Sequence, residues 1–195
     1  MMKYNFYLAL ISFLCAIPLW GQAKYEREFR IRKSQFPERA SAWIEEEIKD
    51  ARRIRFYKEI DSARTRFKAK LKKDRLHYTV EFTSQGDLED IEFIIKEVDI
   101  PREVYGDIED QLAQECGRFK IRRLQQQYPL GAGRKAATLI KDAFQNLILP
   151  YINYKFIVSC KTNEGRVDFE YLFNAEGFFL SRRRSLPPNY DHILY

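Results

Sequence analysis

The chain has 195 residues, of which 45% are hydrophobic and 32% charged, and its 34 basic residues against 28 acidic ones give a formal net charge of +6. This composition is typical of a globular chain of one domain or two small units, and it excludes disordered and collagen-like classes. The two histidines, three cysteines and eight glycines show no zinc-ribbon, P-loop or dinucleotide-binding spacing. We therefore expect no metal site and no cofactor.

Residues 1–23 predict a cleaved signal peptide. A short basic segment with Lys3 is followed by an apolar run over residues 6–20 and by small residues before a charged stretch, which is the pattern of exported proteins. We expect cleavage after Ala23, or alternatively after Gly21. An uncleaved membrane anchor is disfavoured, because the apolar run is shorter than the ~20 residues that a spanning helix needs. The mature protein should be periplasmic or secreted.

Two segments carry the apolar periodicity of an amphipathic helix, and each begins at a proline. The first begins at Phe36-Pro37 and the second at Ile100-Pro101. Proline suits the first turn of a helix, because its missing N–H has no intrahelical partner there. The expected apolar faces are Ala40, Trp43, Ile44 and Ile48 in the first helix, and Val104, Ile108, Leu112 and Cys116 in the second.

Each helix is followed by segments in which apolar and polar residues alternate, as in strands that are buried on one face. After the first helix, strands are predicted over residues 54–60, 66–72, 75–82 and 88–96. After the second helix, they are predicted over residues 118–122, 153–160, 166–173 and 178–184. Between the first two strands of this second group, residues 129–150 contain a linker and a further amphipathic helix.

The two halves of the chain look alike, which predicts an α+β fold made of two repeated units. Phe82-Thr-Ser-Gln-Gly86 matches Phe173-Asn-Ala-Glu-Gly177, and in both motifs the glycine stands where a turn can need a positive φ. We expect each unit to be a helix plus antiparallel strands, joined in one sheet with the helices on one face. The expected boundaries are 24–98 for the first unit, 99–186 for the second with a helical insertion at 129–150, and 187–195 for a C-terminal tail.

The order of these motifs resembles the exported PepSY-like family of Bacteroidetes-type bacteria, which is similar in fold to the beta-lactamase inhibitory protein. The resemblance rests on Phe36-Pro37, Ile100-Pro101 and the two Phe-x-x-x-Gly turns, and it covers residues 28–186. The helical insertion and the unusually basic strands depart from it. The resemblance implies a tandem repeat and a non-enzymatic binding module whose open sheet face grips a protein.

The open face of the expected sheet is the candidate binding site. Neighbouring strands lie about 5 Å apart, so basic residues of one parity would form a continuous patch. The expected set is Arg53, Arg55, Tyr57, Arg66, Lys68, Lys70, Lys72, His77, Lys120, Arg122 and Lys155. We expect an acidic protein or peptide, or an anionic envelope polymer, to bind there. The alternative is a solvated face whose lysines prevent aggregation, while secretion and the small net charge argue against nucleic acid.

The sequence contains no catalytic constellation. His77 and His192 have no serine or cysteine partner at a catalytic spacing, so we expect a non-enzymatic protein. An exported compartment permits a disulfide between Cys116 and Cys160, but both also suit small buried apolar positions, and free thiols are slightly favoured. The rival function is a ligand-binding or enzymatic domain with a pocket between the helix at 134–149 and the sheet.

Overall fold

The computed structural model describes residues 27–60, 64–163 and 165–185. The strands in this part of the chain are β1 (Arg27–Ile31), β2 (Arg52–Ile60), β3 (Thr65–Lys73), β4 (Leu76–Thr83), β5 (Leu88–Ile95), β6 (Phe119–Pro129), β7 (Asn153–Thr162), β8 (Gly165–Asn174) and β9 (Phe179–Arg184). The helices are α2 (Glu38–Ile48), α3 (Arg102–Cys116) and α4 (Ala136–Phe144), with short 3-10 turns η1 (Lys33–Gln35) and η2 (Glu97–Asp99). The predicted signal peptide at 1–23 and the tail at 187–195, with His192, lie outside the described residues.

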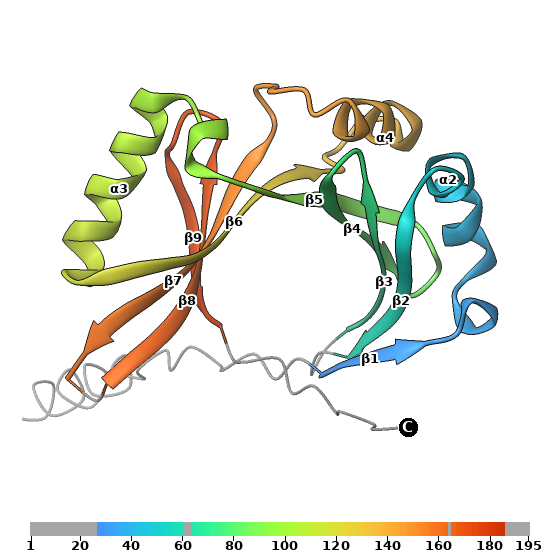
Figure 1. Cartoon of the computed structure of the whole chain (residues 1–195), viewed down its shortest axis with the longest axis horizontal. Helices are drawn as coiled ribbons and strands as arrows, with labels where there is room; N and C mark the ends of the chain where they lie inside the picture. Colours follow the sequence, from blue (N-terminus) through green and yellow to red (C-terminus); the bar gives the residue numbers. More distant parts are fainter. Residues whose placement is uncertain (1–26, 61–63, 164, 186–195) are drawn as a thin grey trace, which may run out of the picture.

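All of the strands belong to one antiparallel sheet, in which the spatial order is the chain order from β1 to β9. Figure 1 shows this sheet strongly bent, with α2, α3 and α4 on its convex side. The buried apolar residues form one core cluster between the sheet and the helices. Every connection is short or carries a helix, so consecutive strands lie side by side.

The expectation of two repeated units is wrong. The described residues form one nine-stranded open sheet with three helices, because β5 and β6 pair continuously from Asp90 with Pro129 to Ile95 with Leu124. In addition, β1 pairs with β2 at the edge of the sheet and was not predicted. The similar hairpins reflect only shared turn chemistry and one buried face, and neither property specifies where a folding unit ends.

The two proline-initiated helices begin where the sequence predicts. Pro37 and Pro101 are the N-cap residues of α2 and α3. Ile44 and Ile108 are fully buried against the sheet, whereas Trp43 is only partly buried at the margin of the core. The helices therefore cover the convex face mainly with aliphatic side chains.

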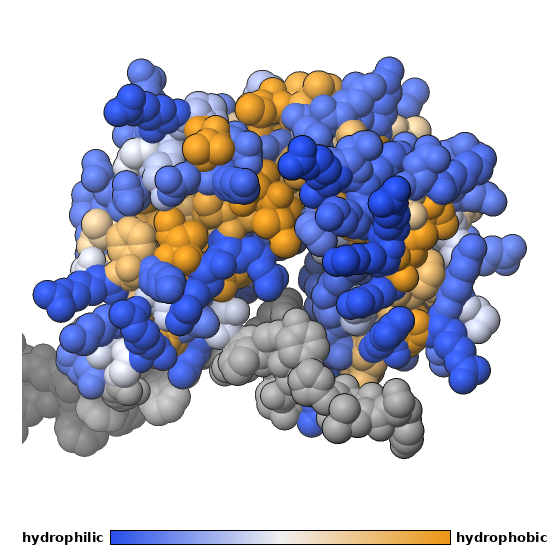
Figure 2. Space-filling view, viewed as in Figure 1, coloured by the Kyte–Doolittle hydropathy of each residue, from blue (hydrophilic) through white to orange (hydrophobic). Residues whose placement is uncertain are grey.

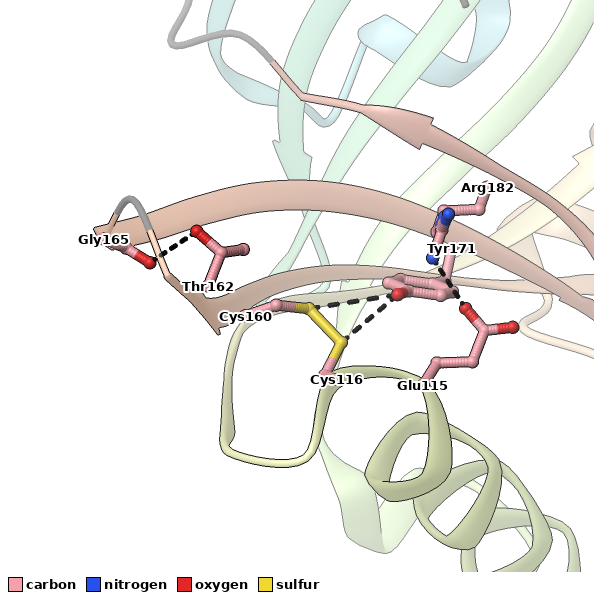
Figure 3. Close-up of a disulfide and its surroundings, with 7 residues drawn as sticks. All are labelled: Glu115, Cys116, Cys160, Thr162, Gly165, Tyr171 and Arg182. Carbon is pink, nitrogen blue, oxygen red and sulfur yellow. Dashed lines mark hydrogen bonds and ion pairs between the residues drawn. A yellow bond between two sulfur atoms is a disulfide. The ribbon is translucent and has the colours of Figure 1, made fainter.

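A disulfide joins the C-terminal end of α3 to β7, which corrects the preference for free thiols. Cys116 and Cys160 are bonded, with their Cα atoms 5.2 Å apart. The hydroxyl of Tyr171 lies 3.2 Å from the Sγ of Cys116, and Arg182 Nη1 of β9 pairs with Glu115 Oε2 at 3.0 Å (Figure 3). The bond spans residues that are far apart in the chain, and it anchors the helix to the sheet.

Candidate functional site

The concave side of the sheet is the face that the three helices do not cover (Figure 1). A hollow of about 740 Å³ runs over it and is lined by side chains from strands at both ends of the sheet. Figure 2 shows hydrophilic side chains along the right-hand wall of the opening, where β2, β3 and β4 lie. This polar concave face is the candidate site.

Acidic and basic side chains are paired across the middle of this face, although β4 and β5 also bring the two acids Glu81 and Asp90 opposite each other. The strand register places Lys68 directly opposite Glu81, and opposite charges at such positions stabilise a strand pair. We call the following set the central charge row: Glu59, Arg66, Lys68, Glu81, Asp90, Glu92 and Lys155. Glu59, Glu81, Glu92 and Lys155 are buried, so the row is a part of the folded interior as well as of the concave face.

Lys68 is the centre of the row on the β2–β4 side. Its Nζ lies 2.5 Å from Glu59 Oε2 and 2.9 Å from Glu81 Oε1, and its side chain is only 13% exposed. Burial opposes the charge on Lys68, but Glu81 and Glu59 outweigh it and raise the pKa of the ammonium well above its usual value. Burial likewise opposes the charge on Glu81, yet Lys68 and Lys155 lower the pKa of that carboxyl to about 2. Both groups are therefore charged at neutral pH.

Lys155 is the corresponding buried cation on the β5–β7 side of the row. It is 8% exposed and forms an ion pair with Glu92. Gln125 Nε2 donates a hydrogen bond of 2.8 Å to the other oxygen of Glu92. Burial opposes the charge on Lys155, but Glu92 and further carboxylates raise its pKa. The charge of Lys155 is thus already paired within the protein.

Asp90 is the least satisfied carboxyl group of the row. One oxygen, Oδ2, accepts a hydrogen bond of 3.0 Å from Gln127, while Oδ1 is buried without a hydrogen-bond partner. Burial, and then Glu81 and Glu92, raise the pKa of Asp90 well above its usual value. Oxygens of these three carboxyl groups lie within 4.8 Å of one another. A metal cation could fit such a cluster in principle, but Lys155 already supplies positive charge to it.

The residues predicted to bind a partner fall into three groups. Arg66, Lys68 and Lys155 belong to the central charge row. Lys70 pairs with Glu28 at 2.5 Å, and its Nζ lies 4.5 Å from the ring centre of Tyr57. The remaining members are Lys72, which is half-buried, and Arg53, Arg55, His77, Lys120 and Arg122, which are exposed. Partner binding by these residues stays a prediction.

The expected continuous basic patch needs correction in the middle of the face. There the bases oppose acids, chiefly Glu59, Glu81, Glu92 and Glu170, that line the same hollow. The sequence interpretation counted the bases of each strand and omitted these acids. The positions of these acids along single strands are visible in the sequence, but the pairing of each acid with a base depends on the register between strands.

The space between α4 and the sheet, where the rival function needs a pocket, is filled. Leu139, Ile140 and Ala143 of α4 are buried there. The rings of Phe144 and Tyr78 stack with centres 4.6 Å apart. This interface is apolar packing, and we therefore locate the candidate site on the concave face.

Comparisons with known proteins identify the fold. No family model and no curated protein matches this chain. Among solved structures, a DUF2874 family protein from Bacteroides ovatus ATCC 8483 aligns with a TM-score of 0.52 and 9% identity, covering 76% of this chain and 87% of that one. A Bacteroides eggerthii DSM 20697 protein, described provisionally as periplasmic, aligns with a TM-score of 0.52 and 12% identity, covering 76% and 88%. A BLIP-like protein from Bacteroides fragilis NCTC 9343 has a TM-score of 0.49 and 10% identity, covering 80% and 92%.

At these identities the similarity concerns the fold alone. For the fold, the predicted resemblance to proteins of Bacteroidetes-type bacteria is confirmed by the Bacteroides structures. None of these matches supports the PepSY-like name or a tandem repeat. Over the described ranges, no helix is both long and apolar enough to cross a membrane.

Proposed function

We propose that this chain is an exported, non-enzymatic binding protein that holds an acidic protein or peptide against the concave face of its sheet. The observation that carries the proposal is the polar hollow of about 740 Å³ on the face opposite the helices. A broad open face of this kind suits a protruding part of another macromolecule better than a small substrate, which usually needs a more enclosed and apolar pocket. The titratable groups of the central charge row are paired with one another, which supports a structural role for them rather than a catalytic one.

Three observations support export. Residues 1–23 have the pattern of a signal peptide. The disulfide between Cys116 and Cys160 is of the kind that persists in oxidising compartments. A protein of similar fold is described provisionally as periplasmic. We accordingly place the mature chain in the periplasm or outside the cell.

The exposed cations support the proposal of an acidic partner. Arg53, Arg55 and Arg122 are exposed and line the hollows of the concave face. The whole chain also has a formal net charge of +6. Complementary charge speeds the encounter of two proteins and favours acidic partners over basic ones.

The proposal is tested by capture from an envelope extract of the source organism, with the mature chain, residues 24–195, as immobilised bait. We expect one acidic protein to be retained, and its affinity, measured by calorimetry with the purified partner, to fall about tenfold between about 50 and about 300 mM salt, because salt screens exposed charges. No specific retention above a bait-free control contradicts the proposal. If the chain chemically converts the retained partner, the proposal that the chain is non-enzymatic is wrong.

A further inference from the structure

One end of the concave face forms a second hollow, of about 300 Å³, with a different charge from the middle. Its charged side chains come from β2, β3, β4 and β6. We call it the cationic hollow, and its basic side chains are Arg53, Arg55, Lys70, Lys72, His77 and Arg123. Among the described residues that line it, none is acidic. This contrasts with the central charge row, where bases are paired with acids.

Apart from Lys70, which pairs with Glu28, the cations of this hollow lack partners within the described part of the chain. No hydrogen bond or ion pair engages the side chains of Arg53, Arg55 and Arg123 there, and all three are exposed. Moreover, Arg55 stands opposite Lys70 on the neighbouring strand. Glu28 pairs with Lys70 but not with Arg55, so Arg55 is the cation of this strand pair that is left for a bound anion.

Two backbone irregularities coincide with the hollow. In β2 the register shifts between Arg52 and Arg55, and Arg53 has a φ of 55°, which is uncommon for a residue other than glycine. In β6 the register shifts between Ile121 and Arg123. Such bulges re-aim side chains and occur often beside functional sites. Here each bulge lies next to an arginine that lines the hollow.

We infer that the cationic hollow receives a short cluster of carboxylates, accompanied by an apolar side chain, from the protein partner. Arginine guanidinium groups bind carboxylates with paired hydrogen bonds. Tyr57 and Ile94 also line the hollow, and Ile94 is 44% exposed, which provides the apolar contact. This inference rests on the proposed function, because it specifies which part of the partner docks and where.

The cluster must be short because of what lies beside the hollow. Towards the middle of the face, Glu81, Asp90 and Glu92 line the neighbouring hollow. A long polyanion that continued across the face would find Lys68 and Lys155 already paired with Glu81 and Glu92, so it would gain little attraction there. The charge pattern thus favours a protein segment whose acidic part ends after a few residues over an anionic polymer.

The test uses a short synthetic peptide with consecutive glutamates followed by a phenylalanine, and a matched peptide with glutamine at each glutamate. We expect the acidic peptide to bind the mature chain about tenfold or more tightly than the glutamine peptide at low salt. Arg55→Glu and Arg123→Glu should each weaken binding about tenfold. Amide chemical shifts measured by NMR should change around the cationic hollow and not along the central charge row.

The matched control is Arg102→Glu, which makes the same charge change at an exposed residue on α3, on the convex side. It should leave the affinity within about twofold, because screening weakens charges beyond ~10 Å. Thermal unfolding checks that each variant is folded, and Arg55→Gln and Arg123→Gln replace any variant that is not. Equal binding of both peptides, equal losses in the control, or tighter binding of long polyglutamate with shifts across the whole face would each overturn the inference.

The same variants separate this inference from the proposed function. If the wild-type chain captures an envelope partner and Arg55→Glu captures it equally well, the function stands and the inference fails. If the acidic peptide binds in the hollow but no envelope protein is retained, the chemistry of the hollow stands and the proposed function fails.

Discussion

Asp90 shows how the concave face sets the charge of single residues. Its register partner in β4 is Glu81, and its buried Oδ1 has no hydrogen-bond partner. Burial and the two neighbouring carboxylates raise its pKa well above the usual value. The folded protein therefore keeps a proton on Asp90 at pH values at which the unfolded chain has released it.

This shift predicts how stability depends on pH. Because the folded state binds the extra proton, the contribution of Asp90 to the free energy of unfolding falls as pH rises from the ordinary aspartate value of 3.8 through the raised pKa. Asp90→Asn cannot ionise, so this variant should become more stable relative to the wild type as pH increases over that window. Urea unfolding at a series of pH values measures the difference.

The control for Asp90→Asn is Asp107→Asn, at an exposed position on α3. Its stability should follow that of the wild type at each pH to within about 0.5 kcal/mol, as is usual for exposed changes. A difference between Asp90→Asn and the wild type that does not change with pH would show that Asp90 has the same pKa in the folded and the unfolded protein, and it would contradict the prediction.

At the scale of elements, the turn between β4 and β5 packs against the helix that covers it. Gly86 has a φ of 83°, and a Cβ atom added to it would lie 2.9 Å from the backbone nitrogen of Ala40 in α2. The residue is buried. Here glycine is needed for two reasons, its positive φ and the close approach of the helix.

Gly133 allows the two reasons to be separated. Its φ of 81° is nearly the same, but a Cβ atom there would meet nothing within 4 Å. Gly133→Ala should lower the free energy of unfolding by about 1 kcal/mol, which is the cost of the backbone conformation alone. Gly86→Ala should cost a further ~1–3 kcal/mol, because the helix must move to admit the methyl group. Equal losses in urea unfolding would show that α2 does not constrain this turn.

How far the sequence predicts this molecule depends on the range of the interaction. Pro37, Pro101, Gly86 and alternating strands are local patterns, and the elements that they predict are present. Similar hairpins do not show whether they belong to two units or to one, because that depends on contacts between distant segments such as the pairing of β5 with β6. The same limit applies to the site. The alternation of residues along each strand predicts which basic residues lie on the concave face. Their pairing with acids depends on the register between strands, and the cationic hollow depends on two bulges, and neither can be derived from single strands.

At the scale of the whole molecule, the two faces of the sheet are held by different forces. The convex face is covered by helices and an apolar core, whereas the middle of the concave face is held by the central charge row. Buried ion pairs add little net stability compared with apolar residues, but removal of one partner leaves an uncompensated buried charge and is costly. The central charge row therefore links distant strands of the sheet. It leaves uncovered the concave face, to which we propose that the partner binds.

Lys68 is the residue at which this idea is tested, since it contacts both Glu59 and Glu81. Its pKa is raised in the folded state, so its contribution to stability is complete below the ordinary lysine value of 10.5 and is lost only as pH rises through the raised pKa. At neutral pH, Lys68→Met should lower the free energy of unfolding by about 3–5 kcal/mol, because two buried carboxylates lose their nearest cation and keep only Arg66, at 3.8 and 3.9 Å. Adding Glu59→Gln and Glu81→Gln to the same chain should recover most of that loss.

The control is Arg55→Met, which removes an exposed cation of the cationic hollow and should change the free energy of unfolding by no more than about 0.5 kcal/mol. If the triple variant is no more stable than Lys68→Met in urea unfolding, the three charges do not act as a unit, and the concave face is held by its backbone pairing alone.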